Sequence, residues 1–168
     1  MAERKTYNVL FLCTGNSARS VFGEVLMNHR GMGRFKGYSA GSHPRGEVHP
    51  LTLEVLKLHR FSIEGLRSKD WSEFERPDAP QMDFVFTVCD RAAAEQCPMW
   101  PGQPMTAHWG IPDPAEVEGD EATRMLAFRE AFKALDNRIK VFVSLPFGSL
   151  DELKLSQRLH DIGQMPTD

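Results

Sequence analysis

Residues 7–20 read YNVLFLCTGNSARS, and this stretch decides the fold. Its first half is a nearly continuous apolar run, which is typical of a parallel strand that is covered on both faces. A loop with one glycine follows. From about residue 18 to residue 29, Val21, Val25 and Leu26 recur at the spacing of one helical face. The stretch therefore predicts a buried strand, a short loop and a helix.

The rest of the sequence continues this alternation of strands and helices. Ser149 and Glu152 form a capping box for a last helix, which Gly163 is expected to close. No repeat, linker or low-complexity tract interrupts the chain, so we expect one α/β domain over residues 1–168 with a parallel sheet. The other expected elements are strands over 35–40, 83–88 and 105–109, and helices from Pro50 and over 121–143.

Charge and composition exclude several classes of protein. The net charge is −3, so no excess of basic residues is available to neutralise a nucleic-acid backbone or an anionic membrane surface. No stretch approaches the roughly 20 apolar residues of a membrane helix, and the first apolar run is too short for a signal peptide. We therefore expect a cytoplasmic protein with no nucleic-acid or membrane partner. In that compartment its three cysteines suit catalytic, redox or buried roles better than structural disulfides.

The loop between the first strand and its helix has the features of an oxyanion site. Unpaired N–H groups and the dipole at the start of a helix attract an anion. Arg19 carries a planar guanidinium that can bind two oxygens of phosphate or arsenate, and Cys13 is placed to attack as a thiolate of lowered pKa. Ser20 is expected to donate a hydrogen bond to that thiolate, and Asn16 to brace the loop. The residues expected to surround the anion are Thr14, Gly15, Asn16, Ser17, Ala18, Arg19 and Ser20. The plain alternative is a cysteine that is merely buried at the end of a strand.

A second cysteine follows the second strongly apolar run. Cys89 comes directly after residues 83–88, as Cys13 comes directly after the first strand. The carboxyl ends of parallel strands meet at one edge of a sheet, where open α/β sheets bind ligands. If the two strands are neighbours, their axes lie only about 5 Å apart, so both thiols are expected on the same side.

With these motifs in place, the sequence resembles the low-molecular-weight protein-tyrosine-phosphatase family. Residues 13–20, CTGNSARS, match its C-x5-R-S phosphate loop, and Asp113-Pro114 matches its acid loop, where the aspartate protonates a leaving group. The resemblance covers nearly the whole chain. It implies a four-stranded parallel sheet flanked by helices, in a Rossmann-like three-layer arrangement.

Within that family the details are more similar to the phosphatase-like arsenate reductases. Phosphatases of this fold usually follow Asp-Pro with aromatic residues, whereas Ala115 and Glu116 follow it here. The segment that contains Cys89 and Cys97, followed by residues 107–114 (AHWGIPDP), looks like the redox portion of those reductases.

The resemblance implies a reaction as well as a fold. Cys13 is expected to attack arsenate held by Arg19, while Asp113 supplies a proton. Cys89 then attacks Cys13 and releases arsenite, and Cys97 moves the disulfide to the Cys89–Cys97 pair. An external dithiol system, either thioredoxin or glutaredoxin with glutathione, is expected to reduce that pair, with no bound cofactor or metal.

Three features, compared with the family, leave the reductant and any bound cation open. Seven residues separate Cys89 from Cys97, a slightly longer spacing than in the thioredoxin-linked members. Ala18 stands where some thioredoxin-linked members have a cysteine. Lys69 lies near the place where some members have residues of a potassium site.

Two other functions remain open. A phosphatase acting on phosphotyrosine needs Cys13, Arg19 and Asp113 but neither of the other cysteines. A non-catalytic thiol redox or metal-binding protein would use the three cysteines with His108. The cysteine spacing, however, lacks the close pair of usual structural zinc sites.

Overall fold

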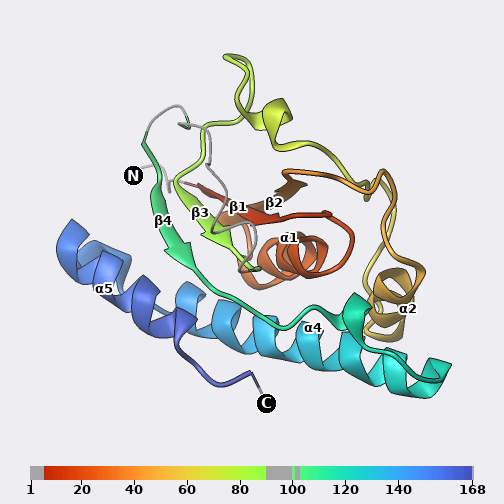
Figure 1. Cartoon of the computed structure of the whole chain (residues 1–168). Helices are drawn as coiled ribbons and strands as arrows, with labels where there is room; N and C mark the ends of the chain where they lie inside the picture. Colours follow the sequence, from red (N-terminus) through yellow and green to blue (C-terminus); the bar gives the residue numbers. More distant parts are fainter. Residues whose placement is uncertain (1–5, 90–99, 101–102, 168) are drawn as a thin grey trace.

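The sheet is parallel and has four strands. A computed structural model describes residues 6–89, 100 and 103–167. The strands pair in parallel in the order β2-β1-β3-β4 (Figure 1). The parallel sheet expected from the alternation of elements, and the four strands implied by the family resemblance, are both confirmed. The strands are β1 (Tyr7–Cys13), β2 (Phe35–Gly41), β3 (Phe84–Thr87) and β4 (Met105–His108).

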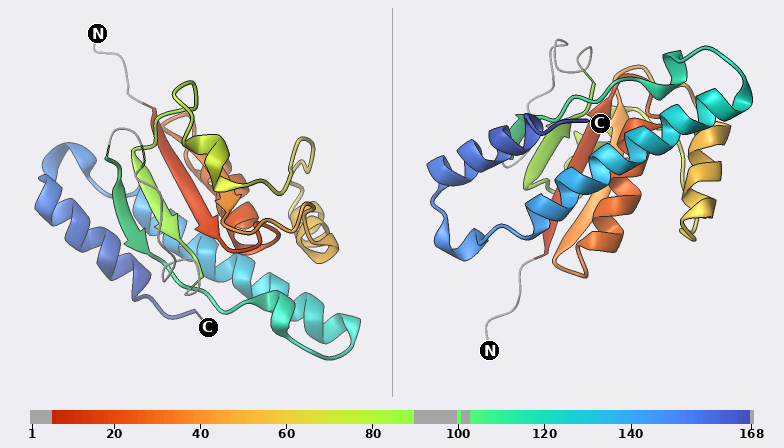
Figure 2. Two further views of the ribbon diagram at one scale, coloured as in Figure 1. Left: turned by 45° about the horizontal axis from the view of Figure 1, so that its top comes forward. Right: turned by 90° about the horizontal axis from the view of Figure 1, so that it is seen from below.

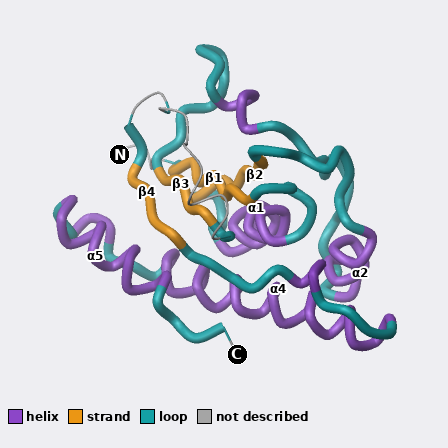
Figure 3. Tube along the Cα trace, in the orientation of Figure 1, coloured by secondary structure: helices purple, strands orange, loops and turns teal. Residues whose placement is uncertain are grey.

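The longer helices gather on one side of this sheet. In the described part of the chain, α1 packs on β1 and β2, and α5 packs on β4. On the same side, α4 contacts both of these helices, and its Phe142 packs on Phe84 and Phe86 of β3 (Figures 1 and 2). Figure 3 shows that the opposite side of the sheet is covered mainly by loops and one short helix. None of the described helices is long and apolar enough to cross a membrane. The α-helices are α1 (Arg19–Arg30), α2 (Pro50–Leu58), α4 (Glu121–Val143) and α5 (Glu152–Gly163), and the 3-10 helices are η1 (Trp71–Phe74), η2 (Pro114–Glu116) and η3 (Phe147–Ser149).

The central strand β1 is buried from both sides, which explains its apolar sequence. Val9 and Phe11 belong to the larger core that α1, α4 and α5 close. Leu10 and Leu12 belong to a smaller cluster on the other face, together with Phe74 of η1. These four side chains of β1 are all 0% exposed. Since full burial of such a side chain stabilises a fold by about 1.5–3 kcal/mol, β1 anchors the sheet on both faces.

The start of the last helix differs from the sequence prediction. Asp151 is the N-cap of α5, where its carboxylate accepts a hydrogen bond from the Lys154 N–H at 2.8 Å. The capping box that begins at Ser149 is therefore wrong, because Ser149 belongs to η3 and the carboxylate next to the first turn takes the capping position. Gly163 does end α5. A Cβ on it would lie 2.3 Å from the His108 carbonyl oxygen, so glycine allows the helix to approach β4 closely.

The carboxyl ends of β1 and β3 lie next to each other. The two strands pair in parallel, with Leu12 opposite Thr87, and the Val88 N–H donates to the Leu12 carbonyl at 2.9 Å. Cys13, the last residue of β1, and Cys89, which follows β3, therefore lie at the same edge of the sheet, as expected. A parallel open sheet binds its ligands at this edge.

Candidate active site

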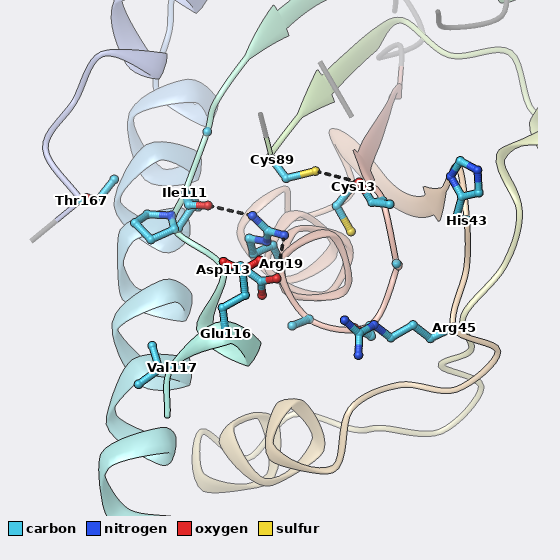
Figure 4. A pocket seen from close by; sticks show the side chains of 16 residues that line it. Cys13, Arg19, His43, Arg45, Cys89, Ile111, Asp113, Glu116, Val117 and Thr167 are labelled. Atoms are coloured by element: carbon cyan, nitrogen blue, oxygen red, sulfur yellow. Dashed lines mark hydrogen bonds and ion pairs between the residues drawn. The ribbon is translucent and has the colours of Figure 1, made fainter. Parts of the chain in front are cut away.

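A pocket of approximately 990 Å³ opens at that edge of the sheet (Figure 4). Its floor is the loop after β1, and its walls come from the loop after β2, from Cys89, and from the loop between β4 and η2. A bare tetrahedral oxyanion fills only a small part of such a volume, which is at the upper end for small-molecule sites. The lining residues from the first loop are Cys13, Thr14, Gly15, Ser17, Ala18 and Arg19, and those opposite include Cys89, Ile111, Asp113 and Glu116.

The carbonyl groups of the loop after β1 are bonded away from the pocket. Backbone N–H groups of the loop after β2 hold them. In a trans peptide the N–H of the following residue points opposite to the carbonyl, so the loop amides face the pocket. The Asn16 N–H demonstrates this orientation, because it donates to Cys13 Sγ at 3.2 Å. The pairs are Ser42 N–H to Cys13 O (3.3 Å), His43 to Thr14 (2.9 Å), Arg45 to Gly15 (3.0 Å) and His49 to Ser17 (3.0 Å).

A chain of hydrogen bonds fixes the direction of the hydrogen bond between Ser20 and the Cys13 sulfur. The Lys69 N–H can only donate, and it donates to Asn16 Oδ1 at 2.8 Å. The other end of that amide, Nδ2, donates to Ser20 Oγ at 2.8 Å. The Ser20 hydroxyl hydrogen is then available for Cys13 Sγ, which lies 2.9 Å from Ser20 Oγ. The expected roles of Ser20 and Asn16 fit this geometry.

The loop has little freedom to take another shape. Asn16 is fully buried and has a φ of 46°, in the left-handed region that asparagine tolerates better than most residues. Gly41, at the end of β2, lies directly behind the loop. A Cβ at Gly41 would be 2.5 Å from the Thr14 carbonyl oxygen and 3.0 Å from the Asn16 nitrogen. The backbone of β2 therefore supports the loop at contact distance.

The pKa of Cys13 departs from the sequence expectation. Burial raises the pKa of its thiol above the ordinary value, and the nearby Cys89 raises it further. The Ser20 hydrogen bond and the Arg19 charge lower it, but they do not offset the burial. The predicted lowering is wrong in direction, because the thiol is only 3% exposed and the Arg19 guanidinium is hydrogen-bonded elsewhere.

Arg19 connects the loop after β1 to the loop between β4 and η2. Its Nη1 donates to the Ile111 carbonyl at 2.9 Å, and its Nη2 lies 3.4 Å from Asp113 Oδ2 (Figure 4). The other carboxylate oxygen, Oδ1, accepts from the Ala115 N–H at 3.0 Å and so caps η2. Asp113 is therefore both the N-cap of η2 and a carboxylate in the pocket.

Cys89 lies in the same pocket as Cys13. It is 3% exposed, and its sulfur is 3.5 Å from Thr14 Oγ1. Figure 4 shows the sulfur atoms of both cysteines at the pocket wall, and both are free thiols. The expectation that both thiols reach one side of the sheet is confirmed. Cys97, the third cysteine of the predicted set, lies outside the described residues.

Lys69, which the sequence singled out near a possible cation site, has a nearly buried ammonium group. Its side chain is 9% exposed. The ammonium Nζ lies 3.5 Å from Glu24 Oε1 and from Ser39 Oγ, and 3.2 Å from the Arg67 carbonyl. Over the residues the structure describes, no three His, Cys, Asp or Glu side chains gather as a metal ion would require.

Several pocket residues were not found by reading the sequence. His43 and Arg45 follow β2. Because β2 pairs in parallel with β1, the residues after β2 lie at the same edge of the sheet as Cys13, and this rule could have located them. Ile111 acts through its backbone carbonyl, and Thr167 reaches the pocket from the chain after α5. The sequence could not predict either contribution. The Ile111 contact uses a backbone carbonyl, which every residue has, and the position of Thr167 depends on where α5 packs.

Comparison with known proteins gives consistent results. Residues 8–156 match the family described as low molecular weight phosphotyrosine protein phosphatase. The arsenate reductase of Shouchella clausii is 33% identical to this chain over 135 residues, which cover 80% of this chain and 93% of that protein.

Two solved structures are similar in fold. An arsenate reductase from Archaeoglobus fulgidus superimposes with a TM-score of 0.63 at 27% identity, over 82% of this chain and 99% of that one. A thioredoxin-dependent arsenate reductase from Corynebacterium glutamicum gives a TM-score of 0.59 at 26% identity, over 83% of this chain. The present chain spans 61% of the length of that second protein.

Proposed function

The chain belongs to the low molecular weight phosphotyrosine protein phosphatase family. The relatives that it matches include arsenate reductases, and we propose that this chain is an arsenate reductase as well. The observation that carries the proposal is the position of Cys89, a second thiol in the pocket of Cys13. Hydrolysis of a phosphate ester through Cys13, Arg19 and Asp113 does not require that second sulfur. The named relatives and the solved arsenate reductases above 25% identity support the same activity.

The binding step uses the floor of the pocket. The loop amides face the pocket, and Arg19 turns its guanidinium from Ile111 and Asp113 toward the oxygens of the bound arsenate. Ser20 donates a hydrogen bond to the Cys13 sulfur and so favours its thiolate form.

The first chemical step forms a sulfur–arsenic bond. The Cys13 thiolate attacks arsenic(V), and one arsenate oxygen leaves as water after Asp113 donates a proton to it. Arsenic remains pentavalent in this adduct. General acid catalysis of this kind contributes about 10²–10⁴-fold in rate.

The second step transfers two electrons. The Cys89 thiolate attacks Cys13 Sγ, so that a disulfide forms while the sulfur–arsenic bond breaks. The electron pair of that bond passes to arsenic, which takes up protons and leaves as arsenite. Cys97 then attacks Cys89 and returns Cys13 to its thiolate form, and an external dithiol protein reduces the Cys89–Cys97 disulfide. Thioredoxin is supported as that protein by the thioredoxin-dependent relative, and a glutaredoxin system is the alternative.

Hydrolysis of phosphotyrosine is the second candidate, and the family match favours it. Cys13, Arg19 and Asp113 are sufficient for that reaction. The lining of the pocket argues against an aryl substrate, because no Phe, Tyr or Trp is among the described residues that line it. Glu116 and Val117 stand after the acid residue instead.

Arsenate-dependent oxidation of NADPH, with thioredoxin and glutaredoxin systems supplied in separate reactions, tests the proposal. The parent chain is expected to be active with one of them. Cys89→Ser should abolish arsenate reduction while it leaves hydrolysis of an aryl phosphate within about twofold of the parent, because only the reduction uses Cys89.

Cys97→Ser is the matched variant for this experiment. It is expected to release a single equivalent of arsenite and to stop with a disulfide between Cys13 and Cys89, which peptide mass mapping would detect. Sustained arsenate turnover by Cys89→Ser, or no arsenate turnover with either dithiol system, contradicts the proposal. If the protein hydrolyses an aryl phosphate but reduces no arsenate with either dithiol system, the phosphatase function is favoured.

A further inference from the structure

A buried arginine on α4 has no acidic partner in the described structure. The side chain of Arg138 is among the largest that are fully enclosed, at 2% exposed for the residue. Its guanidinium donates to two backbone carbonyls, Gly110 O through Nη1 and Met165 O through Nη2, each at 3.0 Å. Its Nε has no partner among the described atoms. Burial of a charged group that is bonded only to carbonyl oxygens costs free energy, so we ask what these two hydrogen bonds hold in place.

The two carbonyls belong to segments that are far apart in the sequence. Gly110 lies between the end of β4 and Asp113, at the start of the acid loop, which is defined here as residues 110–116. Met165 lies in the C-terminal tail, defined here as residues 164–167, which follows α5. The family match ends at residue 156, so this tail lies beyond the part of the chain that the match covers.

The start of the acid loop is held from two directions. From the sheet side, the Trp109 N–H donates to the Thr87 carbonyl at 2.7 Å and the Ile111 N–H to the Val88 carbonyl at 3.0 Å. From the side of α5, the Trp109 indole donates to the Leu159 carbonyl at 3.0 Å. Arg138 adds a bond to Gly110, which lies between these two anchored residues.

The same segment contacts the substrate side of the pocket. The Ile111 carbonyl, one residue after Gly110, accepts the hydrogen bond from Arg19, and Asp113 follows two residues later. The tail itself reaches the pocket, where Thr167 is one of the lining residues (Figure 4). Arg138 therefore joins the tail to the backbone that presents both Ile111 and Asp113.

We propose that Arg138 is a positioning residue for the acid loop and that the C-terminal tail is the anchor against which it works. Among the described residues, the hydrogen bonds of Arg138 go to Gly110 and Met165 and not to Cys13 or the rest of the oxyanion loop, residues 13–20. It holds the Gly110 carbonyl against the tail, so that Asp113 faces the pocket. The inference rests on the proposed function only in that Asp113 is taken as the acid.

Three variants of the protein separate this role from general stabilisation. Arg138→Met keeps the apolar stem and removes the charge and its donors. A chain that ends at Gln164 keeps Arg138 and removes the Met165 carbonyl. Arg129→Met is the matched control, because it removes an exposed arginine from the same helix.

Hydrogen–deuterium exchange is the primary measurement, because it does not depend on any activity. Amides of residues 108–117 are expected to exchange roughly tenfold faster in Arg138→Met and in the shortened chain, but not in Arg129→Met. Amides of residues 13–20 should keep the parent rate, since Asn16, Gly41 and the loop after β2 hold them. Exchange of residues 108–117 at the parent rate in both variants overturns the inference, and so does an equal increase over the whole chain.

Kinetics with arsenate are the second measurement. Arg138→Met should lower kcat roughly ten- to a hundredfold and leave KM within about twofold of the parent, because displacement of an acid group affects the chemical step. When both changes are combined, the loss should not exceed that of the worse single variant, since each breaks the same connection. Additive losses count against the inference. A parent chain that does not reduce arsenate defeats the proposed function alone, because the exchange measurement still decides on Arg138.

Discussion

The carboxylate of Asp113 lies 3.4 Å from the guanidinium of Arg19, although the first residue caps η2 and the second begins α1. The two side chains are mostly buried, so the pair is only partly screened by water. Arg19 therefore orients the acid loop with the same donors that serve a bound oxyanion. Under the proposed function, we expect a bound anion to draw these donors away and to leave Asp113 next to the reacting oxygen.

Replacement of Asp113 by asparagine separates its two roles. The amide oxygen still accepts the Ala115 N–H and caps η2, but the side chain can no longer deliver a proton. We expect kcat for arsenate to fall about 10²–10⁴-fold, with a free energy of unfolding within about 0.5 kcal/mol of the parent. Steady-state kinetics and urea denaturation provide these two quantities.

Glu116→Gln is the control for that variant, because Glu116 is another carboxylate on the wall of the same pocket. Its kcat should remain within about twofold of the parent. Similar losses in both variants would show that the pocket needs negative charge in general rather than an acid at one position.

Replacement of Ser20 by alanine tests the hydrogen-bond chain to the nucleophile. The Ser20 hydroxyl lowers the pKa of Cys13 against the raising effect of burial, so its removal should raise that pKa further. A hydrogen bond to a charged group contributes about 1.5–3 kcal/mol, so alkylation of Cys13 by iodoacetamide at neutral pH should slow by about tenfold or more. The profile of alkylation rate against pH should move to higher pH.

Ser156→Ala, which changes an exposed serine of α5, is the control for this measurement and should leave the alkylation rate unchanged. An unchanged rate in Ser20→Ala as well would mean that the serine does not donate to the sulfur.

Cys13, Arg19 and Cys89 could be located from the sequence because local rules place them. A buried strand, a glycine-containing loop and a helix start bring Cys13 and Arg19 together within one segment. Cys89 follows from the rule that parallel strands end at one edge, and β1 and β3 are indeed neighbours. The continuous apolar sequence of β1 also foretold its burial on both faces.

Other features could not be read in this way. Asp113 was found only through the family resemblance, because its distance from Arg19 depends on where β4 and the connection after it lie relative to α1. The pKa of Cys13 depends on the balance between burial and two neighbours, and sequence patterns do not measure burial. Ile111 and Gly110 contribute carbonyl groups, which every residue has. Arg138 looked like any polar residue of a long amphipathic helix.

Replacement of Gly41 by alanine tests how closely β2 supports the oxyanion loop. The added Cβ would meet backbone atoms of Thr14 and Asn16, which cannot move without displacement of the loop amides. We expect a loss of about 1–3 kcal/mol in the free energy of unfolding, as for other overpacked sites. Binding of inorganic phosphate should weaken by at least about tenfold, measured as protection of Cys13 from iodoacetamide.

Gly148→Ala is the matched control, because a Cβ at Gly148 would meet no atom within 4 Å. It should bind phosphate as the parent does. If Gly41→Ala keeps the parent's affinity, the loop adapts to the added methyl group and its shape does not depend on β2.

His49 makes the stability of the protein dependent on pH. It caps α2 by accepting the Leu51 N–H through Nδ1 at 3.0 Å, which requires the neutral ring. Burial lowers the pKa of His49, as do the positive charges of Arg124 and Arg45. Because the pKa in the folded state lies below that of the unfolded chain, the cap contributes fully above the unfolded value. Its contribution is lost as the pH falls through the folded value.

His49→Asn keeps a capping acceptor that does not titrate within the physiological range. Between about pH 8 and pH 5, the parent should lose about 1 kcal/mol more of its free energy of unfolding than this variant, as measured by urea denaturation at both pH values. The other histidines are present in both proteins, so their contributions cancel in the comparison. His160→Asn, at an exposed position of α5, should follow the parent at both pH values. If His49→Asn loses as much stability as the parent on acidification, the protonation of His49 is not linked to the cap of α2.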